Sequence, residues 1–167
     1  MERCGALGAR AGSAEMQTWG RLANENPPIF KPFDRFGHRI DEVEFHPHYH
    51  DLMGEAMRFG LSNAAWNEQE AGHVGFAALS YLFGQAEAGV LCPMTMSYAA
   101  VPSLRIQPDV GEPWIEKLLS TEYDGRFLPI EQKKSATFGM AMTEKQGGSD
   151  VRANSTRATP IGASGPG

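Results

Sequence analysis

The 167-residue sequence has little cysteine, no excess of basic residues and no long apolar run. Its two cysteines, Cys4 and Cys92, stand outside any CxxC spacing. Their scarcity disfavours a zinc site or a disulfide scaffold and is typical of a reducing, cytoplasmic compartment. The 15 Lys and Arg against 20 Asp and Glu give a formal net charge of −5, so the chain as a whole offers no electrostatic footprint for nucleic acid.

No segment has the character of a membrane span or a targeting signal. The longest uncharged stretch, residues 88–104, contains Pro93 and Pro102 together with Thr95, Ser97 and Ser103, and we predict that it is buried inside the protein. Residues 1–14 lack an apolar core long enough for secretion. We therefore expect a cytoplasmic protein of one domain, or slightly more, without membrane attachment.

Apolar residues at helical spacing predict an antiparallel helical bundle over residues 49–119. The clearest stripe begins at Tyr49, and Pro47 before it suits the first turn of a helix. Further helices are predicted for residues 64–88, residues 93–104 and the segment after Pro113. The expected fold is mainly α.

Three conspicuous side chains in this region are predicted to have structural roles. Trp66 and Trp114 lie on helical faces, and a bundle of this size needs large apolar anchors, so we expect both in the core. Cys92 is interpreted as a small buried hydrophobic residue and not as a nucleophile.

His46, His48 and His50 form an HxHxH run that raises the question of a metal site. On the predicted helix only His46 and His50 share a face. Asp51 is the one acidic residue beside them, and a metal site normally has acidic groups supporting its ligands. We therefore predict a solvated helix start and no metal site.

The pattern changes from helical to alternating after Tyr123. Residues 133–143 place apolar and small or polar side chains on opposite faces, which predicts a strand, and a glycine-rich loop follows at residues 145–149. One or two strands do not form a stable sheet alone. We therefore expect a helical domain over residues 1–127 and the first strand or strands of an incomplete β-barrel domain over residues 128–167, in a truncated chain.

The segment Gly139–Asp150 carries the chemically most informative residues. A strand there would deliver Thr143 and free backbone amides at its end, and two glycines would let the main chain approach a ligand closely. The Ser and Asp that follow add a hydroxyl group and a charge. Backbone amides and hydroxyl groups arranged in this way can bind a flat heteroaromatic ring and a pyrophosphate beside it. From spacing alone, an ordinary hairpin turn is the alternative interpretation.

The same segment resembles the flavin-binding TE…GSD loop of the acyl-CoA dehydrogenase superfamily. Its form MTEKQGGSDVRANSTRA, with LCPMTMSYAAVPSL and GRLANENPP upstream, is similar to the branch named for the adaptive response to alkylation damage (AidB-like). The resemblance extends from about Ala14 onward. It implies a helical bundle leading into a β-barrel, FAD as cofactor, and acyl-CoA as the substrate of the complete protein.

The resemblance also implies roles for individual residues. The flavin-binding residues would be Met140, Met142, Thr143, Gly148 and Ser149, with the first three at the isoalloxazine ring and Ser149 at the pyrophosphate or the acyl thioester. Tyr98 and Met94 are candidates for lining an acyl pocket. No catalytic residue is assigned, because none of the following matches the family's base: Glu116, Glu122, Glu131 and Glu144. In relatives the base lies downstream, so we expect no dehydrogenase activity from this chain alone.

Two other functions stay open at this point. The branch is linked to the alkylation response, which makes a DNA-associated protective protein the alternative. Residues 109–144 hold seven acids and four bases, so a DNA surface would have to lie downstream. The third possibility is a helical interaction module that oligomerises through its apolar faces. The complete protein is expected to be a homo-oligomer.

Overall fold

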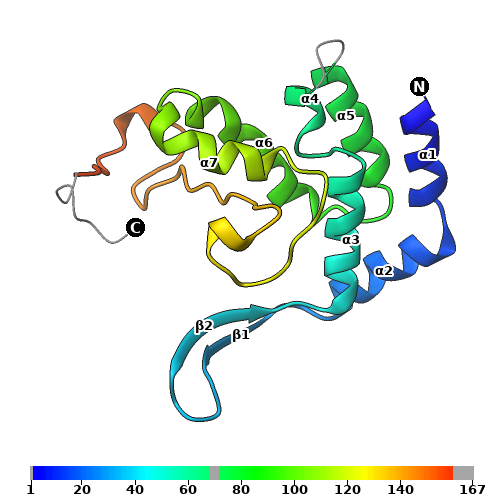
Figure 1. The fold of residues 1–167 in the computed structure, drawn as a ribbon, viewed down its shortest axis with the longest axis horizontal. Helices are drawn as coiled ribbons and strands as arrows, with labels where there is room; N and C mark the ends of the chain where they lie inside the picture. The colour runs from blue at the N-terminus through cyan, green and yellow to red at the C-terminus, as the bar shows by residue number, and fades with distance from the viewer. Residues whose placement is uncertain (1, 68–71, 160–167) are drawn as a thin grey trace.

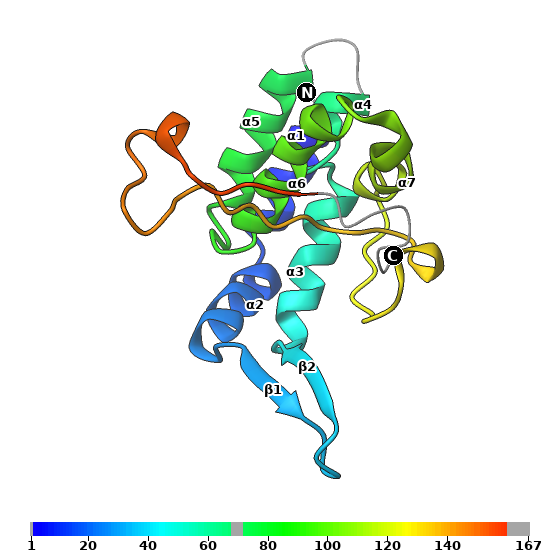
Figure 2. The same cartoon turned by 90° about the vertical axis from the view of Figure 1, so that its left-hand side faces the viewer.

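The structure is a computed structural model that describes residues 2–67 and 72–159. Within these residues it is mainly α-helical, with a single two-stranded antiparallel sheet (Figures 1 and 2). The elements are α1 (Glu2–Ala11), α2 (Ala14–Glu25), β1 (Ile29–Phe33), β2 (Arg39–Glu44), α3 (Pro47–Arg58), α4 (Ala64–Asn67), α5 (Gly72–Phe83), α6 (Leu91–Leu104) and α7 (Pro108–Leu118). Short 3₁₀ turns follow at Ile130–Gln132 and Val151–Ala153. No helix in the described ranges is long and apolar enough to cross a membrane.

The prediction of a mainly α fold is confirmed, and two helices agree closely with expectation. α3 begins at Pro47, which occupies its first turn, and α6 ends at Leu104. The predicted start after Pro113 is wrong, because α7 begins at Pro108 and contains Pro113. Pro108 suits the first turn of a helix, where no N–H is needed. α1 and α2 were not predicted.

The prediction of one continuous helix over residues 64–88 is also wrong. A Cβ on Gly72 would lie 2.9 Å from the carbonyl oxygen of Ala65. In a continuous helix these residues would be about 10 Å apart along the axis, at 1.5 Å per residue. α4 and α5 are therefore two separate helices, and residues 68–71 between them lie outside the described residues. α5 ends at Phe83 and not at Ala88.

The buried core lies among α1, α2, α3, α5 and the first turns of α6. Its large, fully buried side chains are Leu7, Met16, Leu52, Met53, Met57, Leu61, Leu79, Phe83, Val90 and Met94. Each such side chain stabilises the fold by roughly 1.5–3 kcal/mol relative to an exposed position. α2 packs against α3, and α6 packs against α7.

Two predictions about single side chains need correction. Trp66 and Trp114 are half-buried and not members of the core. Each meets aromatic rings at the edge of the core, because Trp66 stacks on Tyr98 and Trp114 meets Phe138 edge to face. Cys92 is exposed and not buried. It lies in the first turn of α6, on the side away from the packed residues Val90 and Met94.

The β1–β2 hairpin was not predicted. Its register pairs Ile29 with Glu44 and Phe30 with Val43, and it becomes irregular between Lys31 and Phe33. Pro32 inside β1 and the consecutive acids of β2 obscure the strand pattern in the sequence. The hairpin extends away from the helices (Figure 1).

Residues 133–143 do not form the predicted strand. The segment is extended but has no ladder partner in the described ranges, and the isolated bridge Glu144–Gly147 follows it. Its amides bond to the helical domain instead. Alternation in a sequence favours an extended backbone, but a strand also needs a neighbouring strand to hydrogen-bond with.

Candidate functional site

The segment that carries the predicted cofactor residues is anchored on α6. The amide of Phe138 donates to Ser97 Oγ at 3.0 Å, and the amide of Met140 lies 3.2 Å from Met96 Sδ. Ser97 is itself buried and donates its hydroxyl hydrogen to the carbonyl oxygen of Pro93 at 2.7 Å. These contacts fix the extended chain just before Thr143.

The predicted site residues lie at the surface at the end of this segment. Met140 and Met142 are 43% and 54% exposed, and Thr143 and Ser149 are exposed as well. Among the described residues, the main-chain N–H groups of Met142 and Thr143 have no hydrogen-bond partner. The segment therefore presents free donors.

The structure brings Thr143 and Gly148 together. A Cβ on Gly148 would lie 2.9 Å from Thr143 Cγ2 and 3.1 Å from its hydroxyl oxygen. Any larger residue would displace the threonine side chain, so glycine is needed here for a close approach. Ser149 follows directly, on the exposed side of the turn.

Glu144 closes the loop, a role that the sequence did not reveal. Its carboxylate accepts from the amides of Ser155 at 2.9 Å and Thr156 at 2.6 Å, from both hydroxyl groups and from the Gln146 side chain. The Asn154 side-chain amide donates to the carbonyl oxygen of Met142 at 2.8 Å. Residues 142–156 are therefore closed into a loop by side chain to backbone bonds.

These bonds determine the charge of Glu144. Hydrogen bonds from the Ser155 amide, the Thr156 hydroxyl and amide, and Gln146 lower the pKa of Glu144 to about 2. The carboxylate is therefore ionised at neutral pH, with its lone pairs engaged. A group in this state is poorly suited to accept a proton as a general base.

An aromatic cluster on α4, α5 and α6 includes one of the candidate acyl-pocket residues. Tyr98 stacks on Phe76 with ring centroids 4.2 Å apart and on Trp66 at 5.1 Å. Its hydroxyl oxygen lies 2.9 Å from His73 Nδ1. The other candidate, Met94, is buried in the core.

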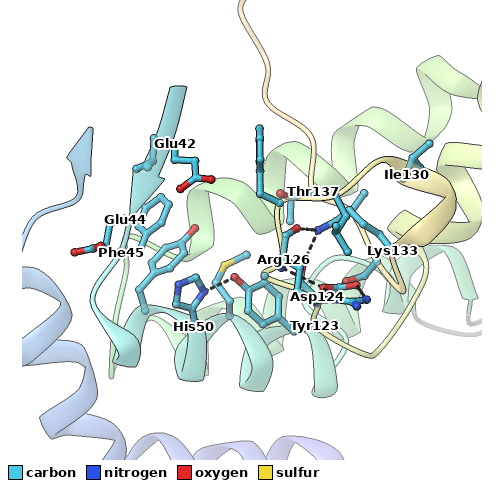
Figure 3. A pocket seen from close by; sticks show the side chains of 18 of the residues that line it. Glu42, Glu44, Phe45, His50, Tyr123, Asp124, Arg126, Ile130, Lys133 and Thr137 are labelled. Carbon is cyan, nitrogen blue, oxygen red and sulfur yellow. Dashed lines mark hydrogen bonds and ion pairs between the residues drawn. The ribbon is translucent and has the colours of Figure 1, made fainter. Parts of the chain in front are cut away.

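A second concave site, which the sequence did not indicate, is a cavity of about 850 Å³ that we call the hairpin groove (Figure 3). It lies between β2, α3, Trp114 of α7 and the segment 123–137. His50 Nδ1 and the Tyr123 hydroxyl oxygen are 2.7 Å apart on its wall. Burial, together with the neighbouring Tyr49 and Asp124, raises the pKa of Tyr123.

Asp124 organises the far wall of the hairpin groove. Its buried carboxylate accepts from Arg126 Nε and Nη2 at 2.8 and 2.7 Å and from the Lys134 amide at 2.9 Å. These bonds, the ones from Arg126 above all, hold the pKa of Asp124 well below its usual range. Lys133 Nζ donates to the carbonyl oxygens of Asp124 and Arg126.

The three histidines of the HxHxH run have separate partners. His48 Nδ1 lies 2.8 Å from Asp51, and His50 bonds to Tyr123 as described above. His46 Nδ1 accepts from the amide of His48 at 3.2 Å and caps α3. In the part of the chain that the structure describes, no group of three His, Cys, Asp or Glu residues has a geometry suited to a metal ion.

Comparison with known proteins gives consistent matches. A family model described as the adaptive response protein AidB N-terminal domain matches residues 1–125. The chain is 46% identical over 156 residues to a candidate acyl-CoA dehydrogenase, AidB, of Escherichia coli (strain K12). It is 28% identical over 142 residues to acyl-CoA dehydrogenase family member 11 of Caenorhabditis elegans.

Two solved structures share the fold. The apo form of Bd2924 superposes with a TM-score of 0.70 at 28% identity and covers 89% of this chain. Caenorhabditis elegans ACDH-11, solved in complex with C11-CoA, superposes with a TM-score of 0.68 at 25% identity and covers 83%. The matched region makes up 29% and 23% of those two chains. It makes up 29% of the Escherichia coli protein and 22% of the nematode family member.

Proposed function

The chain belongs to the family of the AidB N-terminal domain, and from this premise we propose that it is the amino-terminal part of an FAD-dependent flavoprotein that oxidises acyl-CoA. Its helical part would pack beside the acyl-CoA, and its segment 138–150 would supply the first contacts to the flavin. The nematode relative was solved with an acyl-CoA bound, which supports this substrate class. We propose the boundary between the helical domain and the following β-domain near residue 127.

The residues present fit a flavin. Free main-chain N–H groups at Met142 and Thr143 suit the ring's carbonyl and nitrogen acceptors, and the adjoining threonine hydroxyl adds a further hydrogen-bonding group. Gly148, which has no room for a side chain against Thr143, allows a close approach. This juxtaposition of Thr143, Gly148 and the free amides is the observation that carries the proposal.

FAD, when bound, supplies the acceptor for a hydride from the acyl chain. The chain's own contribution is to bind and orient. Met140, Met142 and Thr143 would hold the ring, and Ser149 would reach the pyrophosphate or the thioester. The bonds from α6 to Phe138 and Met140 keep this end of the segment in place.

We propose that the proton-abstracting carboxylate is not in this chain. Glu144, the acid nearest to the loop residues, has its lone pairs engaged and a lowered pKa. Glu116 and Glu122 form ion pairs with Lys117 and Lys134 on the surface of the helical part. The 167-residue chain alone should therefore show no acyl-CoA turnover.

A DNA-binding role gains no support from the described surface. Most of its basic side chains are paired with acids, including Arg10, Arg21, Lys31, Arg39, Arg58, Lys117, Arg126 and Lys134. Binding to the phosphate backbone needs clustered cations that are free to replace counterions.

A chimeric protein tests the proposed function. Residues 1–167 would replace the matching segment of Escherichia coli AidB, and the purified chimera would be assayed for bound FAD and for acyl-CoA oxidation. We expect the chimera to contain FAD and to oxidise acyl-CoA. The isolated 167-residue chain should neither oxidise acyl-CoA nor reduce added FAD in its presence. A monodisperse, helical chimera that contains no FAD would contradict the proposal.

A further inference from the structure

The peptide unit that joins Met142 to Thr143 is bonded at one of its two polar groups. Asn154 Nδ2 donates to the carbonyl oxygen of Met142 at 2.8 Å. The N–H of Thr143 belongs to the same peptide unit and has no partner among the described residues. The peptide is trans, so its C=O and N–H lie in one plane and point in opposite directions. The bond from Asn154 therefore directs the Thr143 N–H away from Asn154.

The same bond makes the Thr143 N–H a better donor. A carbonyl oxygen that accepts a hydrogen bond polarises its peptide unit, and successive hydrogen bonds strengthen one another. A flavin ring gains negative charge when it is reduced, and a donor aimed at that charge stabilises the reduced form more than the oxidised form. An effect of Asn154 on a bound flavin would therefore change the reduction potential as well as the affinity.

Asn154 is itself held in place on both sides along the chain. Its side chain is half-buried, whereas Ala153 and Ser155 are exposed. The 3₁₀ turn Val151–Ala153 ends at Asn154, whose amide donates to the carbonyl oxygen of Val151 at 3.3 Å. The next two amides, of Ser155 and Thr156, donate to the Glu144 carboxylate. A side chain on a fixed backbone loses little conformational entropy when it forms its bond.

The role of Asn154 can be separated from that of Glu144. Glu144 closes the loop through bonds to residues 155 and 156 and makes no bond to Met142 or Thr143. In the described part of the chain, the bond from Asn154 is the one hydrogen bond to the main chain of Met142 and Thr143. Loss of the Asn154 amide should therefore free this peptide unit and leave the loop closed.

We propose that Asn154 is a positioning residue of the flavin site, whose side-chain amide aims and strengthens the Thr143 N–H that contacts the ring. This inference rests on the proposed function, in which the flavin lies against Thr143. Asn154 acts through the peptide unit and does not itself touch the ligand.

The chimera with Escherichia coli AidB tests the proposal when it carries Asn154→Leu, because leucine has a similar branched shape but no donor. We expect the dissociation constant of FAD to rise about tenfold and the reduction potential of the bound flavin to become more negative. Asn67→Leu is the matched control. It removes a side-chain amide that donates to the carbonyl oxygen of Leu119 at 3.2 Å in the helical part, and it should leave both quantities unchanged.

Hydrogen exchange of the purified 167-residue chain provides a measurement without flavin. The Ser155 and Thr156 amides should exchange at the same rate in Asn154→Leu as in the parent chain, because their bonds to Glu144 remain. If these amides exchange as fast as in Glu144→Gln, Asn154 holds the loop as a whole, and the proposed positioning role is wrong.

Failure of this inference can be told apart from failure of the proposed function. If the parent chimera folds but contains no FAD, both are wrong. If the parent chimera binds FAD and Asn154→Leu changes neither the dissociation constant nor the reduction potential, the positioning role alone is wrong.

Discussion

Glu144 shows how one carboxylate can organise a loop. It gathers two amides and two hydroxyl groups from residues 155 and 156, and with the Asn154–Met142 bond it closes the loop that contains Thr143. Thr143 and Gly148 lie within the loop that these bonds close. The position of the flavin-facing residues in our account therefore depends on a residue that does not itself touch the ligand.

Replacing Glu144 by Gln should loosen this loop, because an amide offers fewer acceptor sites to the same donors. Hydrogen exchange of the Ser155 and Thr156 amides should become faster. Glu131→Gln, the same change at an exposed residue that has no ion-pair partner among the described residues, serves as the control.

The pKa of Glu144 is lowered from 4.5 to about 2 in the fold. Its contribution is therefore complete above about pH 4.5 and is lost as the pH falls toward 2. Equal protection in both variants, or protection that is constant across this range, would refute the role.

At the scale of elements, glycines determine how closely the helices pack. A Cβ on Gly111 of α7 would lie 2.2 Å from the carbonyl oxygen of Leu104 at the end of α6, whereas one on Gly54 of α3 would meet nothing within 4 Å. Gly111→Ala should lower the free energy of unfolding by about 1–3 kcal/mol, because the two helices must separate. Gly54→Ala should raise it by about 0.5–1 kcal/mol through helix propensity alone. Urea denaturation measures both, and a stabilising Gly111→Ala would show that the α6–α7 contact is not tight.

The same elements show what could be predicted from the sequence. α3 and α6 were predictable because each has a regular apolar stripe or an uncharged run near a proline. The break between α4 and α5 was not, because Gly72 acts through contact with Ala65 and leaves the apolar period intact. The hairpin was missed because its exposed strands have no buried face to impose alternation.

The candidate site divides in the same way. The residues from Thr143 to Ser149 could be proposed from a local motif, because they are close together in the sequence and lie in one loop. The hairpin groove could not, because it joins β2, α3, α7 and residues 123–137 through contacts distant in sequence. The role of Glu144 could not be predicted either, because its carboxylate bonds to Ser155 and Thr156, which are 11 and 12 positions away.

At the scale of the whole molecule, the chain combines a packed helical unit with exposed features at its periphery. The core lies among α1, α2, α3, α5 and α6, whereas the hairpin and the segment 138–156 extend from it (Figures 1 and 2). Our account assigns the extended segment to a flavin. The chain spans 29% of its Escherichia coli relative, so the flavin site would be completed by residues that correspond to the rest of that protein.

The central claim is that Thr143 and the amides beside it hold the flavin. The most direct measurement is the dissociation constant of FAD for the chimera with Escherichia coli AidB, compared between Thr143→Ala and Thr137→Ala. Both changes remove an exposed threonine from the same extended segment, but Thr137 lines the hairpin groove. We predict that Thr143→Ala weakens FAD binding about tenfold, as expected for one lost hydrogen bond, and that Thr137→Ala leaves it unchanged. Equal affinities for both variants and the parent chimera would contradict the account.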